Sequence, residues 1–360
     1  MYLYEVDGMW KVCLAFVGQR SLLIIAAFLS INAHLAPDPH TKGMVALHPM
    51  SEIVVDFMKT LHELPEVVRV EQLTSQSLTK FSVLTASPYV WLAKLLVSIT
   101  GISALGSLLL LSNLFFLLFL TEVYQLATRT AMEDTAVLAA SLAVIWPSSY
   151  EMSLGASTVW VAFLMLVTLR RAVDGQWLIS GITLGLLTLS DSVSLGLLPV
   201  LLYLFWYFQR HSPVSQVAQR SLCFIIPLAI AMYLRGLTFP SLRSLYAGSA
   251  LAQITYLVAN GQMGALFSRE LGGQLITLIC LLVGASVSLA SGFGVVYRVI
   301  PLYTFLLLIL YSPLTGIASR AFYAVSCLPS LASLCSPVLA RVLVFFALLV
   351  GMYEVWAVFA

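Results

Sequence analysis

Only a small number of side chains in this sequence could do acid–base or phosphate-binding chemistry. The 360 residues include 16 acidic and 18 basic side chains. A carboxylate can accept the proton of a reacting hydroxyl, and an arginine guanidinium holds a phosphate with a planar fork of donors. In the predicted membrane topology, three acids and three arginines that could combine these roles lie on the non-cytosolic side of the membrane. They are Asp38, Glu151, Asp191, Arg235, Arg243 and Arg320.

Asp38 is the acid considered for the role of general base. It stands in the sequence PDPH, where proline and aspartate also form an ordinary turn, and this structural role stays open as the alternative. His34 and His40 flank Asp38 and could bind a divalent metal together with it. The three residues match no familiar ligand geometry, so no metal ligand is assigned.

Asp191 interrupts an otherwise apolar stretch, 175–199, within the sequence Ser190-Asp191-Ser192. An ionisable residue at membrane depth is a functional candidate when it faces a cavity or a partner. Serine and aspartate also cap helix ends in a turn between two apolar helices, and both interpretations stay open. Glu151 follows the IWPSS turn, where the first turn of a helix favours an acid for structural reasons.

The composition is that of an integral membrane protein. Hydrophobic residues make up 60% of the chain, charged residues make up 9%, and the mean hydropathy is +0.98, whereas soluble domains have about 25% charged residues. The net charge of +2 is too small for a nucleic-acid-binding protein. The five cysteines lie mostly in apolar runs, which favours packed thiols over a disulfide framework.

Apolar segments of about 20 residues predict an all-α, polytopic protein with about 10–11 transmembrane spans. Residues 1–20 form a cytosolic N-terminal segment, residues 21–35 form the first span, residues 36–87 form an extracytoplasmic loop, and residues 88–360 form a multi-span domain. The predicted spans are centred on Ile25, Leu110, Ala140, Leu164, Leu184, Leu202, Ile226, Leu281, Leu306 and Val344, with a shorter candidate around Ser326.

The orientation follows from basic residues in short loops, because lysine and arginine gather on the cytosolic side of a membrane. Five arginines fall in alternate short loops and are expected to be cytosolic. The loop 36–87, the turn at Asp191 and the region around Arg235 then face the opposite side. The five short-loop residues are Arg129, Arg170, Arg171, Arg210 and Arg220.

The first loop contains a predicted amphipathic helix. In SEIVVDFMKTLHELP, apolar residues recur every three or four positions, with Ser51 as the N-cap and Pro65 as the end. Outside the bilayer, its apolar face must rest on the membrane or on neighbouring spans. A second interfacial element is predicted from Pro88, where Trp91 and Lys94 are typical of a membrane boundary.

Several motifs of the chain are more specific than its hydropathy. They are, in chain order, Ser112-Asn113-Leu114 with Tyr124 and Arg129, the turn Trp146-Pro147, Arg170 with Gly175, Trp177 and Gly181, and Ser319-Arg320 with Tyr323 and Pro329. From about residue 87 to the C-terminus, their order and spacing resemble the GT-C glycosyltransferases, which are polytopic enzymes with lipid-phosphate sugar donors. Among these, the chain is most similar to the family of the second mannosyltransferase of GPI-anchor assembly and its prokaryotic relatives.

Three polar positions depart from the pattern of that family. The family has a Trp-Asp pair just after the first span, whose aspartate works on the acceptor hydroxyl, whereas here Asp38 is the only nearby carboxylate and no tryptophan precedes it. Ser157 and Thr158 stand where the family has a glutamate, and Asp191 stands where relatives have an arginine.

The resemblance implies transfer of a mannosyl or related hexosyl group from a lipid-phosphate donor to a glycolipid acceptor at the lumenal or extracytoplasmic face. It implies the endoplasmic reticulum membrane, for example with dolichyl phosphate donors, in a eukaryote and the plasma membrane in a prokaryote. Asp38 would be catalytic and Arg320 would be the first donor-phosphate group, although an arginine beside a span can simply be an interface residue. Further substrate-binding candidates are Arg243, Arg235, Asp191 and Glu151.

In a second interpretation, the chain does not catalyse a reaction. The three departures from the family pattern favour a catalytically inactive GT-C-like subunit with a structural or assembly role in a membrane complex. In that case the partner is another membrane subunit instead of a sugar donor and a glycolipid acceptor. In both cases the lipid bilayer is a partner and nucleic acid is not.

Overall fold

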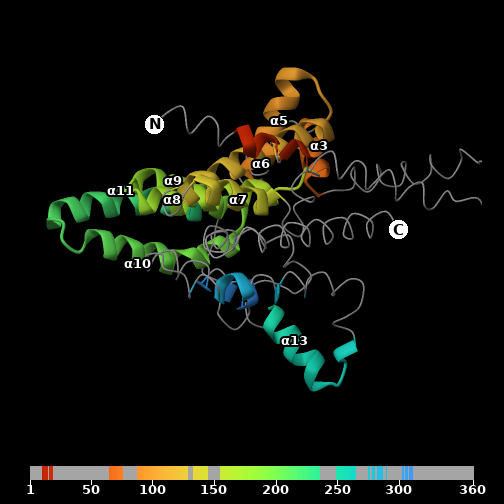
Figure 1. Ribbon diagram of the computed structural model, residues 1–360. Coiled ribbons are helices and arrows are strands. Elements are labelled where there is room, and N and C mark those ends of the chain that lie inside the picture. The colour runs from red at the N-terminus through yellow and green to blue at the C-terminus, as the bar shows by residue number, and fades with distance from the viewer. Residues whose placement is uncertain are drawn as a thin grey trace, which may run out of the picture.

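The computed structural model describes residues 10–14, 16–18, 65–75, 87–128, 133–144, 155–235 and 249–264, with scattered positions between 275 and 310 (Figure 1). Across these ranges the regular structure is helical and no strand occurs. The all-α fold class predicted from the sequence is therefore confirmed.

Two helices of the described chain are long and apolar enough to cross a bilayer, namely α6 (Ala104–Thr128) and α11 (Val214–Arg235). Their 25 and 22 residues exceed the roughly 20 that the hydrocarbon core requires. The other apolar helices in these ranges are shorter. The spans predicted around Ile25, Ser326 and Val344 lie outside the described residues.

Helices α8 (Thr158–Val173) and α9 (Trp177–Ser190) form an antiparallel hairpin that packs against α6 and α11. The chain reverses at Gly175, whose φ of 72° is left-handed, a conformation that glycine adopts without steric cost. The amide of Gln176 donates to the carbonyl of Arg171 at 2.8 Å and closes the last turn of α8. This turn therefore has the glycine that its backbone conformation requires.

Two glycines let α9 approach α11 closely. A Cβ atom at Gly181 would lie 2.6 Å from the carbonyl oxygen of Phe224, and one at Gly185 would lie 3.0 Å from that of Pro227. Glycines four residues apart allow such backbone contact between helices in membranes. Pro227 stands inside α11. Because proline has no backbone N–H, it donates no hydrogen bond to the carbonyl four residues earlier in the helix. The spacing of the two glycines thus fixes how these two helices meet.

The remaining helices surround this group. Helix α5 (Pro88–Thr100) packs on α6 and on α3 (Pro65–Ser75), while α7 (Glu133–Val144) packs on α6. After α9, a short 3-10 helix η2 (Ser192–Leu197) leads into α10 (Leu198–Gln209). Helix α13 (Ala250–Ala259) begins at Ser249, whose hydroxyl accepts a hydrogen bond from the amide of Ala252.

Pro65 starts a helix instead of only ending one. The sequence predicts the end of an amphipathic helix at Pro65, and residues 51–64 of that helix lie outside the described residues. The structure shows α3 from Pro65 to Ser75, as expected for proline at a first helical position. Val67 and Val70 are fully buried against the bundle. This helix was not predicted from the sequence.

The bundle has two ends, because consecutive helices alternate in direction. We call one the Asp191 end: it contains the start of α8 at Thr158, the end of α9 at Ser190, and the end of α11 at Arg235. We call the other the Arg170 end: it contains the ends of α6, α8 and α10. Hydrogen bonds within each end confirm this grouping, from Trp160 to Ser190 at 2.9 Å and from Arg220 to Gln209 at 2.6 Å.

Apolar side chains lie exposed along both long helices. In α6 they recur every four residues, at Leu110, Leu114 and Leu118, and in α11 at Leu222, Ile226 and Ile230. Four-residue spacing puts each set on one helix face, and extended exposed apolar surface is rare in soluble monomers. These faces support the association of the protein with a membrane.

Candidate functional site

The backbone of Asp191 forms the C-terminal end of helix α9. Its amide donates to the carbonyl of Leu187 at 2.8 Å, and its own carbonyl accepts from the amide of Ser194 at 3.2 Å. The Ser194 hydroxyl donates to the same carbonyl at 2.5 Å. The sequence Ser190-Asp191-Ser192 thus forms the turn between α9 and η2, which is the structural interpretation proposed from the sequence.

The Asp191 carboxylate also lies near a cation of α11. Arg235, the last residue of α11, donates from its guanidinium to the backbone carbonyl of Thr188 in the last turn of α9. Asp191 lies close enough to act favourably on this guanidinium, whereas Arg69 of α3 acts on it unfavourably. The two interpretations of Asp191 are compatible, because its backbone makes the turn and its carboxylate lies near Arg235.

Helix α3 brings a second carboxylate to the Asp191 end. Glu66 Oε1 accepts a hydrogen bond from Ser157 Oγ at 2.8 Å and a longer one from the Ser157 amide at 3.4 Å. A carboxylate that accepts from a hydroxyl and an amide is held in one orientation. Glu66 therefore sets an oriented carboxylate beside the first residues of α8.

Tyr89 lies beneath this carboxylate and is fully buried. Its hydroxyl oxygen lies 3.1 Å from the carbonyl oxygens of both Leu108 and Gly155. Burial raises the pKa of Tyr89 above its usual range, and the charge of Glu66 adds to this effect. Tyr89 is therefore a neutral hydrogen-bond donor that joins α5 to α6 and to the turn before α8.

Serine and tryptophan side chains complete the polar layer at this end. The Trp160 indole donates to Ser190 Oγ at 2.9 Å, and the Ser190 hydroxyl donates to the carbonyl of Leu186 at 2.9 Å. Ser87 Oγ lies 3.4 Å from Ser190 Oγ. These contacts join α5, α8 and α9 and fix the backbone on which Asp191 stands.

The structure brings together two of the six predicted site residues, Asp191 and Arg235. The other four lie outside the described residues: Asp38, Glu151, Arg243 and Arg320. The metal ligands considered with Asp38, His34 and His40, also lie outside them. Among the described residues, no three His, Cys, Asp or Glu side chains gather as a metal site would require.

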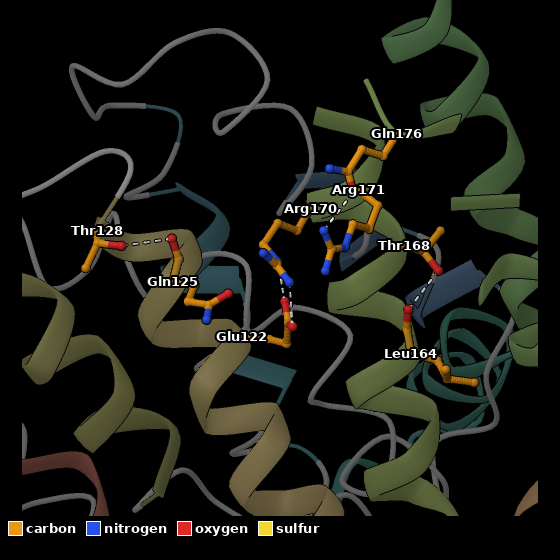
Figure 2. A network of polar contacts seen from close by, with 8 residues as sticks. All are labelled: Glu122, Gln125, Thr128, Leu164, Thr168, Arg170, Arg171 and Gln176. Atoms are coloured by element: carbon orange, nitrogen blue, oxygen red, sulfur yellow. Dashed lines mark hydrogen bonds and ion pairs between the residues drawn. The ribbon is translucent and has the colours of Figure 1, made fainter. Parts of the chain in front are cut away.

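A buried ion pair occupies the Arg170 end (Figure 2). Arg170 Nη2 lies 2.7 Å from Glu122 Oε1, and Arg170 Nε donates to the other carboxylate oxygen. The two side chains are only 9% and 11% exposed. The expectation that Arg170 lies in a short loop is therefore wrong: it stands in the last turn of α8 and turns inward to α6. The neighbouring Arg171 donates to Gln176 at 2.7 Å.

Sequence reasoning missed Glu66, Arg69 and Glu122. Glu122 carries a usable signal, because an acid inside an otherwise apolar span needs a buried partner. The sequence signal for Glu66 is weaker. Glu66 directly follows a proline and is followed by the apolar residues Val67 and Val70, a pattern that is typical of the start of a helix. No local pattern indicates that α3 reaches Ser157.

Comparison of the chain with protein-family models, with curated proteins and with solved structures finds no match.

Proposed function

We propose that this chain is an integral, multi-pass membrane protein with about 10–11 spans and a GT-C-like architecture. It moves a mannosyl or related hexosyl group from a lipid-phosphate donor to a glycolipid acceptor at the lumenal or extracytoplasmic face. One observation carries the proposal: Glu66 of α3 and the Asp191–Arg235 pair occupy the same end of the helix bundle. That end combines the oriented carboxylate of Glu66 with the Arg235 guanidinium and its neighbour Asp191.

The two kinds of group suit the two halves of such a transfer. A carboxylate accepts the proton of the acceptor hydroxyl while the hydroxyl oxygen forms its bond to the sugar carbon. A guanidinium stabilises the phosphate that leaves with the electrons of the broken carbon–oxygen bond. Glu66 is suited to the first role and Arg235 to the second. Asp38, Glu151, Arg243 and Arg320 stay predicted members of the site.

The membrane explains why these roles belong at one end of the bundle. The lipid tail of the donor stays in the bilayer, so its phosphate reaches only the membrane surface. Both ends of α6 and α11 meet such a surface if these helices span the bilayer. We assign the Asp191 end to the extracytoplasmic side, in the endoplasmic reticulum lumen of a eukaryote or outside the plasma membrane of a prokaryote.

A second candidate function is a catalytically inactive subunit that supports the assembly of a membrane complex. A specific observation favours it, because both acids at the Asp191 end already have structural partners. Glu66 accepts a hydrogen bond from Ser157, while Asp191 ends α9 and lies near Arg235. The Trp-Asp pair of the family is also absent from the sequence.

The test is a transfer assay with purified protein in lipid nanodiscs, radiolabelled dolichyl-phosphate mannose and a glycolipid acceptor. The enzyme proposal expects labelled glycolipid from the wild type and a loss of at least about a hundredfold in Glu66→Gln, since general-base catalysis contributes about 10²–10⁴ in rate. Arg171→Gln, at the opposite end, is the matched control and should retain activity. Asp38→Ala tests the predicted loop carboxylate in the same assay.

The two candidates give opposite results. Folded wild-type protein that forms no product with several donors and acceptors contradicts the enzyme and favours the subunit. The subunit proposal in turn expects the protein to co-purify with a membrane partner, and expects that deletion of the partner lowers its abundance. Product formation by the wild type contradicts the subunit.

A further inference from the structure

The turn between α10 and α11 is a rigid hairpin tip at the Arg170 end. Figure 1 shows the two helices joined at the left edge of the molecule. The amide of Ser212 donates to the carbonyl of Gln209 at 2.9 Å, and the amide of Val217 donates to that of Pro213 at 3.1 Å. Arg220 of α11 donates to the buried side chain of Gln209 at 2.6 Å. These bonds fix Arg220 and link the two helices.

Aromatic side chains cover the α10 side of this tip. The rings of Tyr203 and Trp206 lie 6.2 Å apart, and those of Tyr207 and Phe208 lie 5.4 Å apart. Trp206 is 60% exposed. The guanidinium carbon of Arg210 lies 4.9 Å from the centroid of the Tyr207 ring. An exposed amphipathic aromatic group beside a cation is typical of the boundary between the hydrocarbon and the headgroups of a bilayer.

The charge of the hairpin has one sign. No aspartate or glutamate occurs in the sequence between Asp191 and Glu270, whereas the tip contains Arg210, His211 and Arg220. Two described acids of the Arg170 end belong to other elements: Glu122 of α6 is paired with Arg170, and Asp174 follows α8. The hairpin therefore offers two fixed guanidinium groups with no acid of its own.

We propose that this hairpin tip, residues 207–220, binds the phosphate headgroups of anionic phospholipids. Arg210 is held over Tyr207 and Arg220 is held by Gln209, so both guanidinium groups are oriented before a lipid arrives. Guanidinium forks suit phosphate oxygens, and the surface of a cytosolic leaflet is negatively charged. The exposed Trp206 contacts the boundary beneath the headgroups. The site is independent of sugar transfer, because it lies at the end opposite Glu66 and Asp191.

Native mass spectrometry of the detergent-solubilised full chain tests this proposal. The protein is given equal amounts of phosphatidylglycerol and phosphatidylcholine, and the ratio of the bound lipids is measured. We expect the wild type to prefer phosphatidylglycerol. A basic residue near an anionic surface contributes about fivefold in binding, so Arg210→Gln should lower the preference about fivefold. Arg210→Gln with Arg220→Gln should lower it about 25-fold.

Two further variants distinguish lipid binding at the hairpin tip from a general effect of positive charge on the protein. Arg210→Lys keeps the cation and should keep most of the preference. Lys94→Gln removes the cation that lies 5.1 Å from the Trp91 ring at the other end of the bundle, and it should leave the preference unchanged. Equal binding of both lipids by the wild type would overturn the proposal. So would an unchanged preference in Arg210→Gln, whose exposed side chain can be removed without disturbing the core, or an equal loss in Lys94→Gln.

Discussion

Glu66 Oε1 and Ser157 Oγ are 2.8 Å apart and join helix α3 to the start of α8 across 91 positions of the sequence. The contact holds helix α3 against the helix bundle. It also sets a carboxylate at the same end as Asp191 and Arg235. The candidate site depends on this long-range contact as much as on the residues that the sequence makes conspicuous.

Removal of the Glu66 carboxylate should destabilise the protein. A hydrogen bond to a charged group contributes about 1.5–3 kcal/mol, so we expect Glu66→Ala to lower the free energy of unfolding by about that amount. Glu66→Gln should lower it less, because its amide oxygen can still accept from Ser157. Unfolding by SDS in mixed micelles measures both effects. Glu71→Ala changes an exposed acid of the same helix, and an equal effect in that control would contradict the role of the contact.

The buried pair of Glu122 and Arg170 should be sensitive to the loss of either member. Breaking a buried ion pair leaves an uncompensated charge, which costs about 3–5 kcal/mol. We therefore expect Arg170→Met and Glu122→Leu each to reduce the free energy of unfolding strongly. The double variant Glu122→Leu with Arg170→Met should recover most of the loss, because two apolar side chains leave no unpaired charge.

A double-mutant cycle measured by the same unfolding method gives the coupling between the two residues. Arg171→Gln is the control, since Arg171 is the next residue and bonds to Gln176 in the turn after α8. Additive losses in the double variant, or a loss in Arg171→Gln as large as in Arg170→Met, would show that the pair does not stabilise the bundle.

The close contact of α9 with α11 predicts that Gly181 cannot be enlarged. The added methyl group of Gly181→Ala would lie 2.6 Å from the oxygen and 2.9 Å from the Cα of Phe224. Because both atoms are backbone, the helices must move apart, and overpacking of this kind costs about 1–3 kcal/mol. Gly264→Ala is the control, since a Cβ there has no atom within 4 Å. Thermal unfolding should separate the two variants, and equal melting temperatures would contradict the packing.

The helical class of this fold could be predicted because the bilayer limits the choices. A chain with 60% hydrophobic residues must satisfy its backbone hydrogen bonds within each segment, which favours helices. Composition and apolar run length were therefore sufficient for the fold class. They were not sufficient for the inward turn of Arg170, because an arginine near the end of an apolar run reads equally well as a loop residue.

The candidate site was predictable only where one residue was conspicuous by itself. Asp191 stands alone in an apolar stretch, so both its turn and its need for a partner could be predicted. Its proximity to Arg235 and the contact between Glu66 and Ser157 depend on how α3, α9 and α11 pack. Such packing is set by shape, including the two glycines of α9, and residue types along the chain do not encode it locally.

The proposed function requires that the Asp191 end and the Arg170 end lie on opposite sides of a membrane. Single cysteines introduced at Arg69 and at His211, in a variant without the native cysteines, can be labelled with a membrane-impermeant maleimide in sealed vesicles of known orientation. In vesicles with the extracytoplasmic face outward, we expect the cysteine at residue 69 to be labelled at once and the cysteine at residue 211 to be labelled only after the membrane is opened. Labelling of both positions from the same side would contradict it.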